Sequence, residues 1–493
     1  MPRSPLPSWL IELAQQLGPK GLLLPGVNAT DADLLPFEQD WRGRYRGQAL
    51  AVACPASVDE VQQVVRACVS HKVSIVPQGG NTGLVGGGIP DGSGQQVLIK
   101  LHRLNRVLAV DVANLSITVQ AGCTLAQVQE AAHAHGLLFP LSLAAEGSCT
   151  IGGNLATNAG GTQVLRYGTA RELCLGLEVV TASGELWSGL SALRKNNTGY
   201  DLRDLFIGSE GTLGIITAAS LKLFPRPAAH TTALAACDSL QSCVDLLQWV
   251  RQQLDAQLTG FEVMAQAPMQ LVMRHLPDIA RIAQGLNAPD AGSATGHAVP
   301  PWTVLIETSH PRPLMTSEED PVHALLAEAM SQGLIRQAIV SQNQAQHRAM
   351  WALREAIPMA EKAEGLMVKH DIGVTTSQTP AFVQQASLAL QAAFPGHQLV
   401  CFGHLGDGNL HFNVGAPAGQ SAQAFVAEHE GAVNAVVYDL VAQFGGTISA
   451  EHGIGQLKRE ELAQRQSPVA LGLMRAIKQA LDPQGLMNPG RVL

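Results

Sequence analysis

The sequence lacks several features that would place a protein in a special class. It has no run of about eighteen apolar residues, so it predicts no membrane-spanning helix. Its first residues, Met-Pro-Arg-Ser-Pro-Leu-Pro, lack the apolar run of a signal peptide. The eight cysteines form no Cys-x-x-Cys pair, and the two nearest are Cys237 and Cys243. Such spacing is typical of reduced, mostly buried thiols, so we expect an intracellular protein with a cytoplasmic location.

Charged residues are also scarce. They make up 15% of the chain, and the net charge of −8 comes without a basic block. Binding to nucleic acid needs clustered lysine and arginine, so this composition argues against a nucleic-acid partner. Apolar residues make up 46% of the 493 residues, which is typical of a globular protein of two or three domains.

Glycine, by contrast, is abundant and concentrated in loops of the first half. A short strand at 74–77 runs into residues 78–88, where six of eleven residues are glycine. That density excludes a stable helix or strand interior. Such a loop can present successive backbone N–H groups to a phosphate, although it matches neither the P-loop nor the Gly-x-Gly-x-x-Gly fingerprint. A flexible surface linker remains the alternative.

Further glycine loops follow at 120–124, 147–161 and 208–214. The segments around them predict an α+β frame. The predicted helices cover 9–17, 58–71 with Ser57 as N-cap, and 125–135, and the predicted strands cover 115–120, 175–182 and 215–223. Four separate glycine loops suggest a long ligand held by main chain, such as a dinucleotide with two phosphates.

The second half begins near residue 226, where Pro225 and Pro227 mark a boundary. We expect domains at 1–226 and 227–454, and a C-terminal helical segment at 455–493. The predicted elements are helices at 246–254, 321–330 and 455–482, a strand at 303–307 and an exposed loop at 280–301.

Two histidines bracket a turn in the segment 401–414. His404 and His411 flank Gly-Asp-Gly-Asn, which predicts a strand, a tight turn and a strand that bring both imidazoles to one side. Glu451 and His452 follow about forty residues later. Two histidines and a carboxylate with an open position describe a catalytic metal site. The chain has sixteen histidines, so ordinary core or surface residues remain the alternative.

These motifs together resemble a known family. The loop 77–87 resembles the pyrophosphate loop of the FAD-binding fold of vanillyl-alcohol oxidase and p-cresol methylhydroxylase. The segments 151–154, 158–161 and 208–214 look like its flavin-cradling loops, and the C-terminal half resembles the FAD-linked oxidase C-terminal domain. The motifs at His404, His411 and 451–453 resemble those of D-2-hydroxyacid dehydrogenases, in particular the D-2-hydroxyglutarate dehydrogenase branch. The resemblance covers about residues 35–493.

The resemblance implies an α+β fold: a two-subdomain FAD-binding domain and an α+β substrate (cap) domain with an antiparallel sheet. Residues 79–82 offer no histidine for covalent attachment, so we expect dissociable FAD. The residues expected to bind it are Pro77, Gln78, Gly79, Gly80, Asn81, Thr82, Gly83, Gly86, Gly87, Gly147, Ser148, Ile151, Gly152, Gly153, Asn154, Asn158, Ala159, Gly160, Gly161, Tyr167, Gly168, Glu210, Gly211, Gly214, Ile215, Ile216 and Asn488.

The resemblance also implies a reaction, in which a D-2-hydroxy acid becomes a 2-oxo acid and the hydride from Cα goes to flavin N5. A divalent metal, with zinc as first choice, would sit on the two histidines and Glu451. His452 would accept the hydroxyl proton. The residues expected to bind the substrate are Arg354, Lys369, Asn413 and His452.

By itself, Arg354 could be a surface residue on a helix. The resemblance implies that it binds a substrate carboxylate, with which a guanidinium pairs bidentately, and that the substrate is D-2-hydroxyglutarate. Pro358 departs from relatives that have threonine there, which leaves D-lactate and glycolate open. A flavin-free metallohydrolase and a non-catalytic binding subunit are alternatives of other classes. No nicotinamide fingerprint occurs, so we expect another acceptor, a quinone or an electron-transfer protein, and family habit suggests a homodimer.

Overall fold

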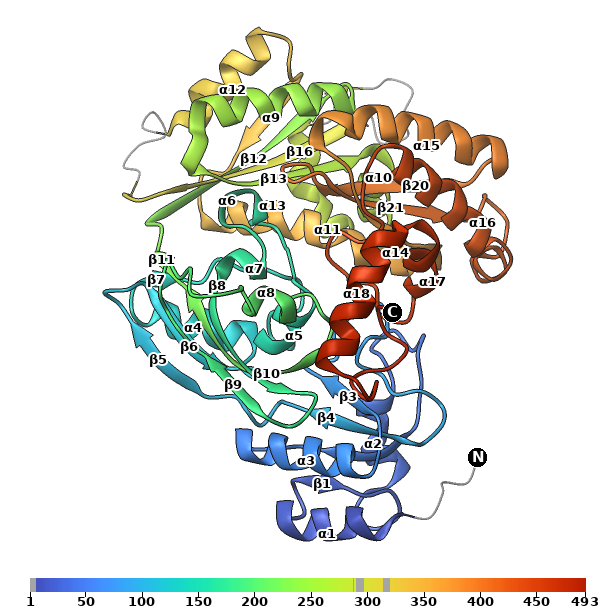
Figure 1. The fold of residues 1–493 in the computed structure, drawn as a ribbon. Helices are drawn as coiled ribbons and strands as arrows, with labels where there is room; N and C mark the ends of the chain where they lie inside the picture. The colour runs from blue at the N-terminus through green and yellow to red at the C-terminus, as the bar shows by residue number, and fades with distance from the viewer. Residues whose placement is uncertain (1–5, 287, 290–296, 314–319) are drawn as a thin grey trace. The chain divides into compact units, whose positions relative to one another are not determined.

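The computed structural model describes residues 6–286, 288–289, 297–313 and 320–493. The chain divides into two compact units (Figure 1). The first unit comprises residues 1–161, 168–226 and 451–493, and the second comprises residues 162–167 and 227–450.

The first unit contains a small mixed sheet near the N-terminus. Its strands, in the order β1-β2-β4-β3, are β1 (Leu22–Leu23), β2 (Ala49–Ala53), β4 (Gln96–Lys100) and β3 (Ile75–Gln78). The helices of this region are α1 (Ser8–Leu17), α2 (Asp31–Glu38) and α3 (Val58–Ser70). The predicted N-cap of α3 is confirmed, because the Ser57 side chain accepts a hydrogen bond from the Glu60 backbone N–H. Strand β3 leads directly into the first glycine loop.

A five-stranded antiparallel sheet forms the other part of the first unit. Its strands, in the order β5-β6-β10-β8-β9, are β5 (Val107–Asp111), β6 (Ser116–Gln120), β10 (Gly214–Lys222), β8 (Cys174–Thr181) and β9 (Leu186–Gly189). The short pair β7 (Leu137–Leu138) and β11 (Phe224–Pro225) lies apart from this sheet. The helices are α4 (Leu125–His133), α5 (Ile151–Ala156), α7 (Ala170–Leu173), α8 (Arg203–Phe206), α17 (Arg459–Arg465) and α18 (Pro468–Leu481). Central strand β10 is buried along all of its length except its last residue, so it anchors the loops at both of its ends.

The second unit is built on one large antiparallel sheet. Its strands, in the order β17-β12-β16-β13-β20-β21-β18 with β19 beside β21, are β17 (Gln337–Val340), β12 (Ala229–Cys237), β16 (Trp302–His310), β13 (Leu258–Ala265), β20 (Gln398–His404), β21 (Asn409–Gly415), β18 (Met367–Val368) and β19 (Asp371–Gly373).

Helices cover both faces of this sheet, because its strands are apolar on both sides. Along β12, Ala233 and Ala235 join one core, and Leu234 and Ala236 join the other. The first core includes α9 (Leu240–Leu254), α12 (Pro321–Ser331), α15 (Thr379–Ala393) and α16 (Ala422–Gln443). The second includes α10 (Gln266–His275), α11 (Pro277–Ala280), α13 (Gln344–Glu355) and α14 (Ile357–Glu364). Figure 1 shows α9 and α12 side by side above β12 and β16.

The structure corrects three expectations about local structure. The helix predicted at 455–482 is two helices, α17 and α18, separated at Gln466 and Ser467. The glycine segment 147–161 contains the short helix α5 rather than loop throughout. The loop predicted at 280–301 begins as a 3-10 helix, Arg281–Leu286, which buries Ala283 and Leu286; residues 287 and 290–296 lie outside the described residues. The other predicted helices and strands are confirmed within a few residues, except that α9 begins well before 246.

The cysteines and the helices bear on two further expectations. All eight cysteines are free and buried. Among the residues the structure describes, no helix combines the length and the apolar character that crossing a bilayer requires.

Candidate active site

The glycine loops of the first unit line a cavity that opens to solvent. Its walls come from the loop after β3, the start of α5 and the start of β10. The sequence-predicted residues that line it are Pro77, Gln78, Gly79, Gly80, Asn81, Thr82, Gly83, Gly86, Gly87, Gly152, Gly153, Asn154, Glu210, Gly211, Gly214, Ile215 and Ile216.

Some of these glycines leave no room for a side chain, because they lie against a neighbouring segment of the chain. A Cβ on Gly80 would lie 2.2 Å from the Ser148 carbonyl oxygen. A Cβ on Gly79 would lie 2.6 Å from Thr150 Oγ1. The sequence suggested that glycine is needed in these loops so that a ligand can approach the backbone. Contact between loops is a second requirement for glycine, which the sequence did not reveal. Gly83 has open space around it, so only the approach of a ligand accounts for glycine there.

Two polar atoms of the cavity wall lack a partner among the described residues. Thr150 Oγ1 and Asp40 Oδ2 are buried and make no hydrogen bond there. An unpaired buried polar atom is costly, so a ligand that donates hydrogen bonds would stabilise both. The hydroxyl groups of FAD have this chemistry, so the cavity fits the cofactor that the motifs imply. Sequence reasoning missed both residues. Asp40 lies outside the glycine loops, and Thr150 lies inside the loop 147–161 but was not among the residues expected to bind FAD.

Lys100 is another residue that sequence reasoning missed. It ends β4 beneath the first glycine loop, and its Nζ donates to the Gly79 carbonyl and to Gln78 Oε1. Burial lowers the pKa of Lys100 to about 8. The Lys100 side chain therefore holds Gln78 and Gly79, where the glycine loop begins, in place.

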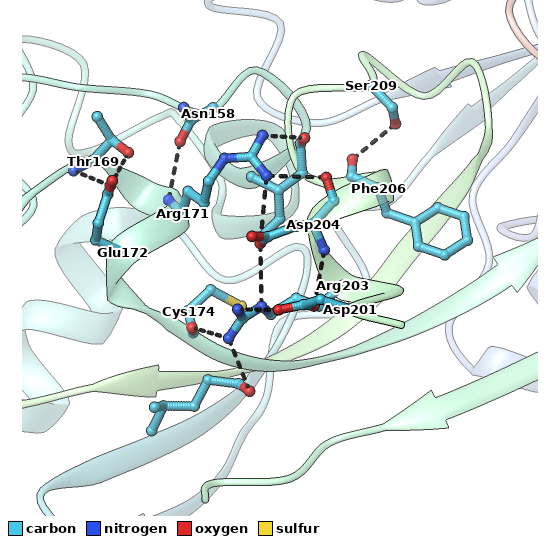
Figure 2. A network of polar contacts seen from close by, with 12 residues as sticks. Asn158, Thr169, Arg171, Glu172, Cys174, Asp201, Arg203, Asp204, Phe206 and Ser209 are labelled. Atoms are coloured by element: carbon cyan, nitrogen blue, oxygen red, sulfur yellow. Dashed lines mark hydrogen bonds and ion pairs between the residues drawn. The ribbon is translucent and has the colours of Figure 1, made fainter. Parts of the chain in front are cut away.

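A polar network joins two of the segments predicted to hold the flavin (Figure 2). The Asn158 side chain accepts a hydrogen bond from the Arg171 backbone N–H at 3.0 Å. The Arg171 guanidinium donates to the carbonyls of Asp204 at 3.0 Å and Ile207 at 2.8 Å. The segment at 158 is thus tied to the turn that precedes Gly208.

Other residues predicted to bind the cofactor lie outside the cavity lining. Tyr167 ends α6 (Val164–Tyr167), which belongs to the second unit, whereas the rest are in the first. The residues of this set are Gly147, Ser148, Ile151, Asn158, Ala159, Gly160, Gly161, Tyr167, Gly168 and Asn488.

The turn that carries Glu451 and His452 is hydrogen-bonded to the glycine-rich segments 147–161 and 208–214. Glu451 Oε1 accepts from the Gly161 backbone N–H at 2.6 Å. The Glu210 carboxylate accepts from the N–H groups of Ile454 at 2.7 Å and Gly455 at 2.8 Å. Burial raises the pKa of Glu210 although these N–H groups act against the rise. His452 lines the cavity, so the structure brings it to the glycine loops.

The second unit holds the two histidines of the predicted metal site. The predicted strand, turn and strand are confirmed as β20 and β21, and the two imidazole centroids are 5.6 Å apart, edge to face. His404 Nδ1 lies 2.7 Å from Glu262 Oε1. If Nδ1 carries the proton, Nε2 presents its lone pair, which is the tautomer that a metal ligand needs.

Glu262, on β13, also holds Arg354. It is 1% exposed and its Oε2 accepts from Arg354 Nε at 2.9 Å. The Arg354 guanidinium lies 4.8 Å from the Phe402 ring centroid. Burial acts to raise the pKa of Glu262, but His404 and Arg354 outweigh it and lower the pKa below its ordinary value. A carboxylate thus joins an imidazole and a guanidinium that are fifty residues apart in sequence.

Lys369 and Asn413 meet on a second buried carboxylate. Glu361 Oε2 accepts from Lys369 Nζ at 2.8 Å, and its Oε1 accepts from Asn413 Nδ2 at 2.6 Å. The Asn413 side-chain oxygen accepts from the His370 backbone N–H at 3.2 Å. Neither Glu262 nor Glu361 was found from the sequence.

Comparison with known proteins identifies the family. Residues 226–492 match the FAD-linked oxidases, C-terminal domain, and residues 49–189 match an FAD binding domain. The chain belongs to the FAD-linked oxidases. A D-2-hydroxyglutarate dehydrogenase of Xanthomonas citri pv. viticola is 40% identical over 461 residues, which are 94% of this chain and 93% of that protein. The mitochondrial D-2-hydroxyglutarate dehydrogenase of Danio rerio is 36% identical over 96% of this chain and 84% of its own length.

Solved structures share the fold at lower identity. An alkyldihydroxyacetonephosphate synthase superposes with a TM-score of 0.73 at 18% identity, covering 99% of this chain and 85% of that one. A p-cresol methylhydroxylase superposes with a TM-score of 0.71 at 18% identity, covering 98% of this chain and 96% of that one. The expected fold, the FAD cofactor and the place in the D-2-hydroxyacid dehydrogenase branch are confirmed, and the chain is an FAD-dependent dehydrogenase. The flavin-free metallohydrolase is thereby set aside.

Proposed function

We propose that this FAD-linked oxidase oxidises D-2-hydroxyglutarate to the corresponding 2-oxo acid. What carries the proposal is the pairing of Arg354 and His404 on Glu262, because it holds together the guanidinium proposed to bind a carboxylate and the imidazole proposed to bind a metal. Relatives that match this chain over nearly its whole length are named D-2-hydroxyglutarate dehydrogenases, which supports the same substrate.

The chain's own residues have distinct roles in this proposal. Arg354 and Lys369 bind the distal carboxylate, and Asn413 binds the carboxylate beside the hydroxyl. His452 accepts the hydroxyl proton, because an imidazole titrates near neutrality. The glycine loops hold dissociable FAD, which when bound supplies the hydride acceptor at N5.

The proposed metal site consists of His404, His411 and Glu451, with zinc as the first choice of metal. The His404–Glu262 hydrogen bond supports it, because metal-binding histidines commonly donate their second nitrogen to a carboxylate. The contact of Glu451 Oε1 with Gly161 N–H fits a monodentate ligand, which keeps one oxygen for a hydrogen bond. A bound cation would lower the pKa of the substrate hydroxyl.

A second candidate substrate class is a monocarboxylate such as D-lactate or glycolate. Pro358 favours it, because proline has no N–H or hydroxyl to offer a distal carboxylate. The non-catalytic binding subunit receives no such support.

A substrate panel tests the proposal. With an artificial electron acceptor, D-2-hydroxyglutarate should give a higher kcat/KM than D-lactate and glycolate, and NAD should not serve as acceptor. A higher value for D-lactate or glycolate would replace the proposed substrate with the second candidate. The absence of flavin absorption bands near ~370 and ~450 nm would contradict a bound flavin.

Several expectations stay predictions from the sequence. They are the quinone or electron-transfer protein as acceptor, the homodimer, the cytoplasmic location and the domain boundaries at residues 226 and 454. The relatives from Danio rerio and Arabidopsis thaliana are named as mitochondrial proteins.

A further inference from the structure

Glu361 lies between two residues that are proposed to bind substrate. Its side chain is 1% exposed, and its two oxygens accept separately from Lys369 and Asn413. Both partners are hydrogen-bond donors, so the carboxylate form of Glu361 matches them. The contacts occupy both oxygens of a residue that has no role in the reaction described above.

Lys369 and Arg354 each pair with a buried anion. Lys369, whose side chain is 41% exposed, pairs with Glu361, and buried Arg354 pairs with Glu262, which is also 1% exposed. A carboxylate so deeply buried is poorly screened by water or salt, so its field acts on any anion that binds nearby. A second substrate carboxylate therefore meets a lysine whose charge is partly offset by Glu361.

The helix that carries Glu361 offers little compensation. Pro358 stands one turn before it on α14 and cannot donate a hydrogen bond. Of the residues assigned to the distal carboxylate, Arg354 has its Nε occupied by Glu262, which leaves the terminal nitrogens of the guanidinium for substrate.

We propose that Glu361 tunes the specificity of this site, because it weakens binding of hydroxy acids that carry a second carboxylate relative to those with an uncharged side chain and so limits the preference for the dicarboxylate. The proposal rests on the proposed function, because it assumes that a D-2-hydroxy acid binds at Arg354, Lys369 and Asn413. Glu361 does not contact the reacting atoms. It acts through the charge of Lys369 and the orientation of Asn413.

The test variant removes the charge of residue 361 and keeps the size of its side chain. Glu361→Gln should raise the ratio of kcat/KM for D-2-hydroxyglutarate to that for D-2-hydroxybutyrate by about tenfold, mainly through a lower KM for the dicarboxylate. An unchanged ratio, within about twofold, would overturn the proposal, and so would an equal change for both acids, because that would show a role only in positioning Asn413.

Glu364 provides the matched control. It lies one turn further along α14, and its carboxylate pairs with Arg274 at 2.8 Å and His275 at 2.6 Å. Glu364→Gln removes the same charge from the same helix, and it should leave the substrate ratio unchanged. A similar shift in both variants would contradict a specific role for Glu361.

A second pair of variants keeps the test open if Glu361→Gln folds poorly. Lys369→Met should lower the ratio, because Glu361 loses its counter-charge. In the double variant, with both members of the pair neutral, the ratio should rise well above that of Lys369→Met, because Glu361 no longer repels the second carboxylate. A double variant as poor as Lys369→Met would show that Glu361 has no effect of its own on the distal group, and it would overturn the proposal.

Failure of the proposed function can be told apart from failure of this inference. If the parent enzyme prefers D-lactate, the proposed substrate is wrong, but the effect of Glu361→Gln on the ratio is still measured. Calorimetric binding of glutarate and butyrate to the flavin-loaded proteins gives the same ratio without turnover. A ratio of Kd values that does not shift in Glu361→Gln would overturn the inference whatever the enzyme oxidises.

Discussion

Substitution of Gly80 by alanine should weaken FAD binding through a clash that the structure defines. The added Cβ would lie 2.2 Å from the Ser148 carbonyl oxygen and 2.9 Å from Cys149 Cα. Ordinary contact begins near 3.4 Å, so two backbone segments of the cavity wall would have to separate by about 1 Å. Overpacking of this kind costs about 1–3 kcal/mol, which corresponds to a loss of about 5- to 150-fold in affinity if the strain is relieved by opening the loop.

The measurement is the Kd for FAD, from flavin fluorescence during titration of the apoprotein, together with the Tm of the apoprotein. Gly92→Ala is the control, because Gly92 is exposed in the same unit and an added Cβ would meet nothing within 4 Å. A Kd for Gly80→Ala within twofold of the parent, with an unchanged Tm, would refute the reasoning that this glycine serves contact between loops.

Three further predictions concern the proposed chemistry. His452→Ala should lower kcat by at least about 100-fold while the protein stays yellow, and a near-normal kcat would remove its role as base. Exhaustive chelation should abolish turnover without releasing FAD, and added Zn²⁺ should restore it; an enzyme indifferent to the chelator would contradict the metal proposal. Arg354→Ala should raise KM for D-2-hydroxyglutarate more than KM for D-lactate, by about tenfold or more, whereas equal changes would show that the guanidinium does not read the distal group.

The sequence predicted well those features that depend on neighbours along the chain. The helix predicted at 58–71 is α3, which buries Val61, Val64, Val65 and Cys68, and the turn residues between His404 and His411 predicted the hairpin. Both signals are local, because a helix and a tight turn are specified by residues a few positions apart.

Two of the incorrect expectations have different causes. The break between α17 and α18 had a signal in the sequence, since Ser467 followed by Pro468 is a common helix start. Helix α5 had none, because two of its six residues are glycine. It forms because the N–H groups of Ile151 and Gly152 bond to the carbonyls of Cys123 and Ala121, which are distant in sequence.

The carboxylates Glu262 and Glu361 could not be found from the sequence for a related reason. Glu262 reaches Arg354 across 92 residues and His404 across 142, and Glu361 reaches Asn413 across 52. A single glutamate in a strand or loop carries no pattern that reveals such partners. Only the paired strands and packed loops bring them together.

Glu210, Glu262 and Glu361 each bind two donors on segments that carry the proposed chemistry. A buried carboxylate is a poor choice for stability, because desolvation offsets most of the attraction. It is a good choice for orientation, because an ionised oxygen makes short and directional hydrogen bonds to two groups at once. A glutamine in the same place would offer one acceptor oxygen and one amino group that faces another donor. The recurrence of the arrangement therefore argues that these positions are selected to hold functional side chains in place rather than to strengthen the fold.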